Sequence, residues 1–268
     1  MTMQTIAFIG GGNMAEALFS GLLKSGHPAD KIAVSDPLPA RLELLSRTYG
    51  VKTHTSNKVA VSGADVVVFS VKPQQMKAVL TEMTAFFSAD MTLISIAAGV
   101  DTAAIKTMLG RDDLALVRAM PNTPAMVGAG MSVLFSDADD NHKQRAAYVM
   151  DACGETAWVD QEPLLHAVTA ISGSGPAYFF LLAELMYGAA ENLKLPTEIA
   201  EKIIRQTAYG AGMMLKQSEK TAAQLRTQVT SPNGTTQAAL DKMYEMNIHE
   251  AVRQGVVAAA KRSKDMMR

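Results

Sequence analysis

The sequence predicts an α/β fold, with a doubly wound parallel sheet in the N-terminal part and an all-helical C-terminal part. Short apolar runs alternate with amphipathic stretches up to about residue 160, which is typical of parallel strands joined by helices on both faces of a sheet. Beyond that point the strand-like runs stop and only long helical periodicities remain. We therefore expect two domains, covering residues 1–160 and 161–268.

The expected strands are short runs of apolar, mostly β-branched residues. Between the first two strands, helical spacing places Met14, Leu18 and Leu22 on one face of a helix. In chain order the expected elements are strand Ile6–Ile9, helix Met14–Lys24, strand Ile32–Ser35, helix Arg41–Tyr49, strand Val66–Val71, helix Gln74–Phe87, strand Leu93–Ala97, helix Thr102–Leu109, and strands Leu114–Arg118, Met131–Phe135 and Glu155–Val159.

The C-terminal part is expected to hold helices at Ala177–Leu193, Thr197–Lys216, Thr235–Glu245 and Ile248–Met267. Ala and Met are frequent in these helices, and the chain holds 18 Met in all. Such side chains suit either close packing across a subunit interface or core filling within one chain. The sequence leaves both interpretations open.

The composition is that of a globular protein. Of 268 residues 48% are hydrophobic, and the net charge of −1 argues against broad electrostatic binding of nucleic acid. The single cysteine, Cys153, excludes an internal disulfide and indicates a reducing compartment. No signal peptide is visible, and the most apolar later stretch, residues 177–190, is short for a membrane span and contains Glu184. We expect a cytoplasmic protein that binds neither membrane nor nucleic acid.

A dinucleotide-binding motif stands near the start of the chain. After the strand Ile6–Ile9, Gly10, Gly12 and Ala15 follow the pattern G-x-G-x-x-A at the start of a helix. Gly10 permits the tight turn, Gly12 lets the backbone approach a pyrophosphate, and Ala15 lets the helix pack closely against the strand. The N–H groups at the helix start would then face the diphosphate. The first domain is therefore expected to be of the Rossmann type.

Asp36 follows the second strand and bears on the choice of coenzyme. An acidic residue at this place usually accepts hydrogen bonds from the ribose hydroxyls of NAD and repels the 2′-phosphate of NADP. The alternative is that Asp36 and Pro37 only start a turn. Arg41 is close enough in sequence to reach a phosphate, so the choice between NADH and NADPH stays open.

Three further segments follow strands: Val71-Lys72-Pro73, Ala97-Ala98-Gly99 and Arg118–Pro124. Ligands of open parallel sheets lie outside the carboxyl ends of the strands, so the first two segments are expected to edge the coenzyme crevice. Two prolines fix the backbone of the third segment. Its alternative role is a rigid connection between the sheet and a lid.

Two small-residue loops, Ser172–Tyr178 and Thr230–Thr236, lead into helices of the C-terminal part. The first-turn N–H groups of a helix have no partner inside the helix, and a carboxylate placed there gains about 0.3–1 kcal/mol from the helix dipole. Ordinary capping by Ser and Thr is the alternative. The presence of two such loops favours the binding of an anionic substrate.

The sequence lacks a recognisable acid–base or metal cluster. An alcohol or ketone dehydrogenase needs a group that exchanges the proton of the substrate oxygen, whereas a protonated imine is electrophilic as it stands. The missing acid–base pair therefore favours imine reduction. The five histidines are scattered along the chain at His27, His54, His142, His166 and His249.

Taken in order, these motifs resemble those of the pyrroline-5-carboxylate reductases. The resemblance covers nearly the whole chain and is most specific at Arg118–Pro124, Ser172–Tyr178 and Thr230–Thr236. It implies an oxidoreductase of CH–NH groups that transfers a hydride from NADPH or NADH to the imine carbon of 1-pyrroline-5-carboxylate, giving L-proline in the final step of proline biosynthesis. It also implies a homodimer formed through the helical domains, and a decamer of five dimers.

The resemblance also implies roles for single residues. The hydroxyl of Thr236 would be the catalytic group facing the ring nitrogen, and the N–H of Thr235 would bind the substrate carboxylate. Asp36 stands where the family often has a small or hydroxyl residue, which argues against a strict preference for NADPH. The implied substrate-binding residues are Glu219, Ser231, Gly234, Thr235 and Thr236. The implied cofactor-binding residues are Phe8, Ile9, Gly10, Gly11, Gly12, Asn13, Met14, Ser35, Asp36, Asn57, Val71, Lys72, Pro73, Ala97, Ala98 and Gly99.

Two other functions fit parts of the sequence. A β-hydroxyacid dehydrogenase has the same two-domain plan, but it needs a Lys and an Asn after a glycine run. Aligning that run on Gly175 places Phe179 and Ala183 at the two positions, so the proton carrier is missing. A non-catalytic, dinucleotide-sensing oligomer is the other alternative, and the intact Thr230–Thr236 loop argues against it.

Overall fold

The computed structural model describes residues 3–266, and the chain divides into two compact units. The sheet unit comprises Met1–Ser174 with Ala259–Arg268, and the helical unit comprises Gly175–Ala258. The division lies later than the expected boundary after residue 160, because Leu165 and Val168 pack against Val133 and Phe135 of the sheet.

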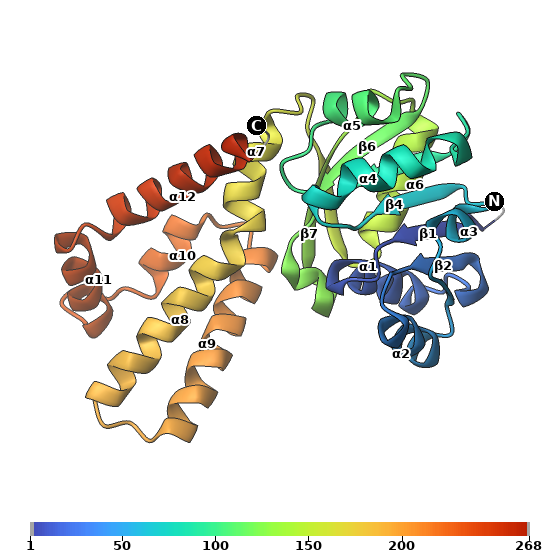
Figure 1. Ribbon diagram of the computed structural model, residues 1–268. Helices are drawn as coiled ribbons and strands as arrows, with labels where there is room; N and C mark the ends of the chain where they lie inside the picture. The colour runs from blue at the N-terminus through green and yellow to red at the C-terminus, as the bar shows by residue number, and fades with distance from the viewer. Residues whose placement is uncertain (1–2, 267–268) are drawn as a thin grey trace. The chain divides into compact units, whose positions relative to one another are not determined.

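The sheet unit is built on eight strands in the order β3-β2-β1-β4-β5-β6-β7-β8 (Figure 1). All neighbouring strands are parallel except β6 and β7, which are antiparallel. The strand order changes direction between β1 and β4, and such a switch point is where open α/β sheets bind ligands. The strands are β1 (Ile6–Ile9), β2 (Ile32–Ser35), β3 (Lys52–His54), β4 (Val66–Phe69), β5 (Thr92–Ser95), β6 (Ala115–Met120), β7 (Gly130–Phe135) and β8 (Gly154–Trp158).

Helices cover both faces of this sheet (Figure 1). Side chains of successive strand residues point to opposite faces, so Ile6 and Phe8 enter one core while Ala7 and Ile9 enter the other. Burial on both faces explains why these strands read as continuous apolar runs. One face holds α1 (Asn13–Lys24), α2 (Pro39–Tyr49) and α6 (Asp140–Asp151), and the other holds α3 (Asn57–Val61), α4 (Pro73–Met83) and α5 (Thr102–Leu109). Short helical turns lie at η1 (Ala29–Lys31), η2 (Thr84–Phe86) and η3 (Thr123–Val127).

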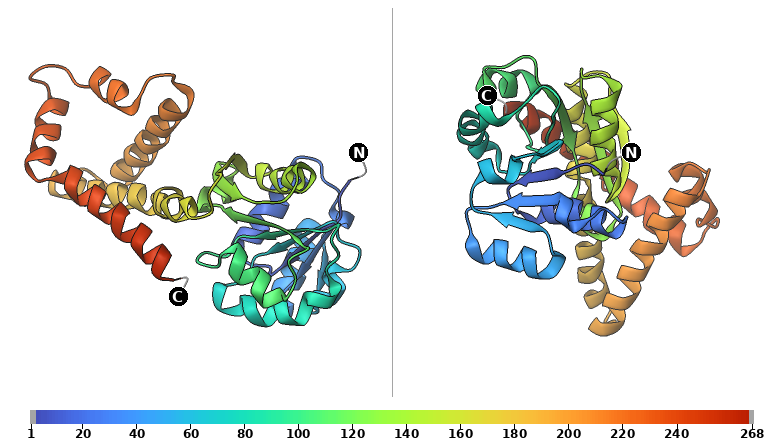
Figure 2. Two further views of the ribbon diagram at one scale, coloured as in Figure 1. Left: turned by 90° about the horizontal axis from the view of Figure 1, so that it is seen from above. Right: turned by 90° about the vertical axis from the view of Figure 1, so that its right-hand side faces the viewer.

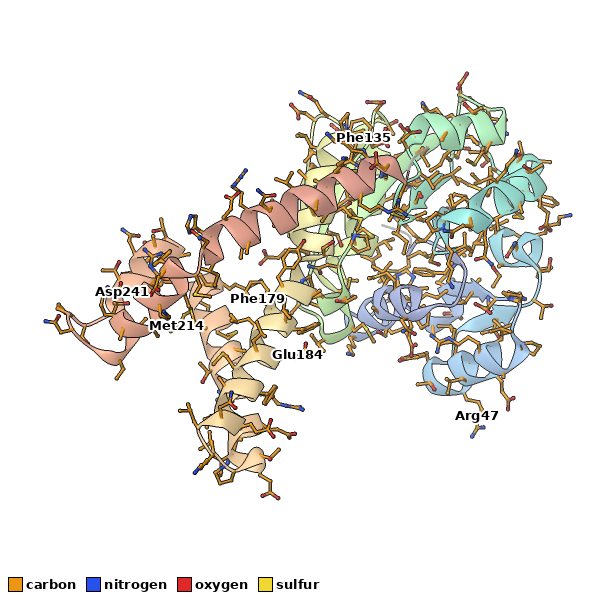
Figure 3. The ribbon with its side chains drawn as sticks, turned by 60° about the vertical axis from the view of Figure 1, so that its left-hand side comes forward. Arg47, Phe135, Phe179, Glu184, Met214 and Asp241 are labelled. Atoms are coloured by element: carbon orange, nitrogen blue, oxygen red, sulfur yellow. The ribbon has the colours of Figure 1, made fainter. Side chains whose placement is uncertain are left out.

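The helical unit has a small core of its own. α8 and α9 run side by side (Figure 2) and pack through Ala190, Ala200 and Ile204. Most of their large apolar side chains are instead exposed, including Phe179 at 68% and Met214 at 51% (Figure 3). These side chains therefore do not fill a core within the helical unit. The helices are α8 (Gly175–Asn192), α9 (Thr197–Gln217), α10 (Ala222–Gln228), α11 (Thr235–Glu245) and α12 (Ile248–Asp265), whose end belongs to the sheet unit.

The segment Ser172–Tyr178, expected as a loop that leads into a helix, holds the junction between a π-helical turn and α8. α7 (Leu164–Val168) continues through a π-helical turn, Thr169–Gly173, into α8, and the Ser174 N–H donates to the Thr169 carbonyl at 2.8 Å. The small residues allow this turn to approach Met120, whose Cε lies 2.5 Å from where a Cβ on Gly173 would stand. The predicted helix Ala177–Leu193 corresponds to α8, which begins two residues earlier, at Gly175.

The continuous helix also changes the view of its apolar stretch. Leu164–Asn192 is, among residues 3–266, one helix long and apolar enough to cross a membrane, judged by length and composition alone, and 22% of its most apolar window is buried. The expectation that this stretch is short for a span was therefore wrong. The length comes from α7 and the π turn, which the sequence pattern did not reveal.

Candidate active site

The glycine motif forms the tight turn that its spacing predicts. Gly10 has a φ of +97°, and a Cβ at this position would stand 2.8 Å from the Ser70 carbonyl oxygen at the end of β4. The Ser70 hydroxyl donates to the carbonyls of Ile9 at 3.0 Å and Gly10 at 2.7 Å. The turn between β1 and α1 is thus fixed against the neighbouring strand.

The start of α1 fits the diphosphate of a dinucleotide. Gly12 is the N-cap of α1, it is exposed, and no side chain caps the helix there. A Cβ on Gly12 would meet nothing within 4 Å, so a ligand can approach the backbone at the helix start closely. A helix start with free N–H groups attracts a negatively charged ligand.

The end of β2 supplies polar groups beside this turn. The Asp36 carboxylate accepts hydrogen bonds from the N–H groups of Gly11 and Leu38, both at 2.9 Å. The Ser35 hydroxyl donates to Asn57 Oδ1 at 2.8 Å, which joins β2 to the first residue of α3. Because β1 and β2 are parallel neighbours, the glycine turn and these groups lie at one edge of the sheet.

The segments after β4 and β5 lie at the same edge. β4 pairs with β1 and with β5, all parallel, so Val71-Lys72-Pro73 and Ala97-Ala98-Gly99 follow neighbouring carboxyl ends. Lys72 is exposed and caps the start of α4, and Gly99 has a φ of +73°. A Cβ on Gly99 would stand 3.1 Å from Met266 Cβ, so the residue that follows the C-terminal helix packs on this turn.

The structure thus brings the predicted cofactor segments to one sheet edge, with one restriction. The side chains of Phe8 and Ile9 are 0% and 1% exposed and belong to the two cores. Only the backbone of these two residues can contribute to a ligand site.

An ion pair that the sequence did not reveal holds the nearby loops. Arg118 on β6 is buried, and its guanidinium donates to Glu162 at 3.1 Å, with side-chain exposures of 4% and 15%. The same carboxylate accepts from the Thr102 N–H at 2.8 Å and from the Thr102 hydroxyl at 2.6 Å. Glu162 therefore ties the first residue of α5, which follows the Ala97–Gly99 segment, to the strand that leads into Arg118–Pro124.

Asn122 ties the Arg118–Pro124 segment to the π turn. Its amide nitrogen lies 3.3 Å from the Ser172 carbonyl and 3.2 Å from the Ser172 hydroxyl, and its amide oxygen accepts from the Met131 N–H at 2.9 Å. These contacts account for polar residues in both motifs. They are structural roles, in line with the rigid connection considered for this segment.

The Thr230–Thr236 segment forms a tight turn at the start of α11, within the helical unit. Asn233 has a φ of +56°, and the Gly234 N–H donates to the Ser231 carbonyl at 3.0 Å. Gly234 is the N-cap and no side chain caps α11, so the first-turn N–H groups around Thr235 and Thr236 are available to a ligand. A Cβ on Gly234 would meet the Ser231 hydroxyl and would stand 3.1 Å from the Ser231 carbonyl oxygen, so a larger residue there would require the Ser231 side chain to move.

Glu219 lies in the exposed connection between α9 and α10. Its role stays a prediction.

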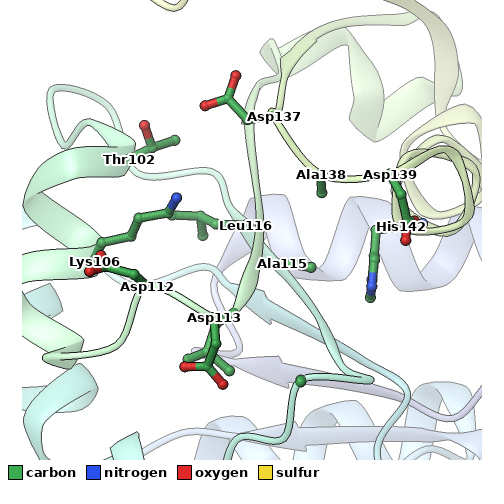
Figure 4. A pocket seen from close by; sticks show the side chains of 12 residues that line it. Thr102, Lys106, Asp112, Asp113, Ala115, Leu116, Asp137, Ala138, Asp139 and His142 are labelled. Atoms are coloured by element: carbon green, nitrogen blue, oxygen red, sulfur yellow. Dashed lines mark hydrogen bonds between the residues drawn. The ribbon is translucent and has the colours of Figure 1, made fainter.

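A cavity of about 270 Å³ lies elsewhere, along α5 and the amino end of β6. Its lining includes Lys106, His142, Asp112, Asp137 and Asp139 (Figure 4). The glycine motif stands at carboxyl ends of strands, so this cavity is not the predicted site. Over residues 3–266, no group of His, Cys, Asp and Glu side chains is arranged to hold a metal ion.

Comparison with known proteins decides the family. A reductase named pyrroline-5-carboxylate reductase from Pseudomonas aeruginosa is 44% identical over 99% of this chain and 98% of its own length. The chain belongs to the pyrroline-5-carboxylate reductase family. The family's relative from Haemophilus influenzae is 39% identical over the same shares of both chains. A family model described as pyrroline-5-carboxylate reductase dimerisation matches residues 162–266, and one described as NADP oxidoreductase, coenzyme F420-dependent, matches residues 5–99.

Solved structures of the family share the whole fold. A pyrroline-5-carboxylate reductase from Coxiella burnetii has a TM-score of 0.93 at 38% identity, with 100% of both chains covered. The Plasmodium falciparum enzyme, solved with NADP bound, has a TM-score of 0.88 at 27% identity, again over 100% of both chains. The predicted fold class, a Rossmann-type sheet followed by a helical domain, is confirmed.

Proposed function

We propose that this protein reduces 1-pyrroline-5-carboxylate to L-proline with NADPH or NADH, the final step of proline biosynthesis. The observation that carries the proposal is a pair of uncapped helix starts, one at α1 and one at α11, each in a motif that the sequence singled out. Full-length similarity to reductases of this name supports it. One start suits the coenzyme diphosphate and the other suits the substrate carboxylate.

The sheet unit would hold the coenzyme, which supplies the hydride when it is bound. The first-turn N–H groups of α1 bind the diphosphate, and Asp36 accepts from the hydroxyls of the adenosine ribose. Asn57 and Ser35 lie at the adenosine end. The segments Val71–Pro73 and Ala97–Gly99 line the ribose and nicotinamide side.

The turn at the start of α11 would hold the substrate. The Thr235 N–H binds the carboxylate, and the helix dipole adds about 0.3–1 kcal/mol to that interaction. The Thr236 hydroxyl oxygen accepts a hydrogen bond from the protonated ring nitrogen and so orients the imine carbon. Ser231 and Gly234 shape the turn, and Glu219 is assigned to the substrate side by resemblance. A protonated imine already carries the proton of the product amine on its nitrogen. It therefore accepts the hydride at carbon without a side-chain acid.

The exposed apolar side chains of the helical unit suit a subunit interface. We propose a homodimer in which a second copy covers the apolar side chains of α8 and α9, of which Phe179, Phe180 and Leu185 are each more than 60% exposed. Burial of such a surface releases about 25 cal/mol per Å². Contact with a second copy also explains why an apolar helix is exposed on one chain of a protein that we place in the cytoplasm. We further propose that five such dimers form a decamer.

The test is oxidation of NADPH and NADH by the purified protein with 1-pyrroline-5-carboxylate, run beside oxidation of 3-hydroxyisobutyrate with NAD⁺ and NADP⁺. We expect turnover of the imine and formation of L-proline. Turnover of the hydroxyacid alone would reject the proposal in favour of a β-hydroxyacid dehydrogenase.

A further inference from the structure

A charged cluster lies beside the glycine turn and contains Arg41, which follows the end of β2 in the chain. We call it the Arg41 clamp, and it consists of Gly11, Glu16, Arg41 and Tyr49. Arg41 donates through Nε to the Gly11 carbonyl at 2.6 Å and through Nη2 to Glu16 at 2.5 Å. The Tyr49 hydroxyl donates to the other oxygen of Glu16 at 2.7 Å. Within this cluster the guanidinium is held from two sides.

The position of the clamp bears on the coenzyme. Gly11 lies inside the glycine motif, and its N–H donates to Asp36 while its carbonyl accepts from Arg41. In this fold the residue after β2 faces the adenosine ribose, and a 2′-phosphate on that ribose needs a basic partner. Between residues 32 and 46 Arg41 is the sole Lys or Arg in the sequence. Arg41 is therefore the guanidinium nearest in sequence that a 2′-phosphate on this ribose could recruit.

Glu16 opposes that recruitment. Its side chain and that of Arg41 are only 28% and 21% exposed, so their ion pair is partly shielded from solvent. The Glu16 carboxyl has a lowered pKa: burial opposes the shift, while hydrogen bonds from Tyr49 and Arg41 outweigh it. A 2′-phosphate would compete with this carboxylate for Arg41 and would also approach the carboxylate of Asp36. Both effects disfavour the phosphate, whereas a 2′-hydroxyl needs neither change.

We propose that Glu16 is a specificity-determining residue: by holding Arg41 on the glycine turn it withholds the guanidinium from a 2′-phosphate and, with Asp36, favours NADH over NADPH. This inference rests on the proposed coenzyme site. It assigns a selectivity role to a residue outside the glycine motif and outside the segment after β2.

The test is binding of NAD⁺ and NADP⁺ to the substrate-free protein, measured by isothermal titration calorimetry. The variants are Glu16→Ala, Arg41→Ala and the double variant, with Glu16→Gln as a milder change. Glu43→Ala is the matched control, because Glu43 is an exposed glutamate on α2 that forms an ion pair with Arg47, at 3.9 Å. Thermal unfolding of each variant shows whether it is folded.

Glu16→Ala should strengthen the binding of NADP⁺ relative to that of NAD⁺ by about tenfold. This is the order expected when one charge-assisted hydrogen bond is released for the phosphate. Glu16→Gln should shift the ratio in the same direction, and removal of Arg41 in the Glu16→Ala background should abolish the gain. Glu43→Ala should leave the ratio unchanged. The inference is overturned if Glu16→Ala and Glu16→Gln leave the ratio at the wild-type value, or if the gain persists without Arg41. Failure to bind either coenzyme would instead reject the proposed function.

Discussion

Removal of Glu162 is expected to destabilise the sheet unit strongly. The Arg118 side chain is 4% exposed, and Glu162 is the ion-pair partner that the structure gives it. Breaking a buried pair by removing one partner typically costs about 3–5 kcal/mol, because the other charge stays buried without compensation. Glu162→Ala also leaves the Thr102 N–H and hydroxyl without their acceptor. We therefore expect a loss of about 3–5 kcal/mol in the free energy of unfolding.

The assay is urea unfolding followed by circular dichroism at one fixed protein concentration, since dimer formation would make the midpoint concentration-dependent. Glu43→Ala is the control, because it removes a glutamate from an ion pair whose side chains are 72% and 80% exposed, and it should cost less than about 1 kcal/mol. Replacing both partners, as Arg118→Met with Glu162→Leu, should recover much of the loss. Equal losses for Glu162→Ala and Glu43→Ala would refute the reasoning.

Three further predictions concern single side chains. Thr236→Ala should lower kcat at least about tenfold while the Kd for NAD⁺ stays unchanged, and a wild-type kcat would remove Thr236 from the mechanism. Burial and the nearby Asp151 raise the pKa of Cys153 to about 11, so a thiol reagent at about pH 8 should react only after unfolding, and rapid reaction of the native protein would contradict this. Burial, and secondly the charge of Arg118, lower the pKa of His166 in the folded protein. The stability that the neutral imidazole contributes is therefore full above about pH 6.5, and it is lost as the pH falls through the pKa of His166 in the folded state. His166→Gln should reduce the loss of unfolding free energy between about pH 7 and 5, and an unchanged slope would exclude this cause.

Much of the sheet was visible in the sequence because its strands are buried on both faces. β1 and β2 have the predicted bounds, and α5 and α11 also match residue for residue. β3 was missed because Lys52–His54 is an edge strand with no buried residue. α6 was missed because charged and polar residues dominate it, and only Ala146, Val149 and Met150 are buried.

The candidate site was predictable where backbone geometry depends on glycine, and not where partners are distant in sequence. Gly10 stands where its motif requires it, with a φ of +97° and a close approach to the Ser70 carbonyl. Glu162 lies 44 residues from Arg118 and 60 from Thr102, so spacing gave no sign of their contact. The direction of β7 was equally hidden, since a buried apolar run reads the same in parallel and antiparallel strands.

The most direct measurement follows the transfer of deuterium from NADH or NADPH that carries two deuterium atoms at nicotinamide C4. The coenzyme is incubated with the protein and 1-pyrroline-5-carboxylate, and the product is analysed by mass spectrometry and NMR. Hydride transfer to the imine carbon predicts L-proline carrying one deuterium on Cδ. Proline without deuterium, or deuterium on another carbon, would contradict the account.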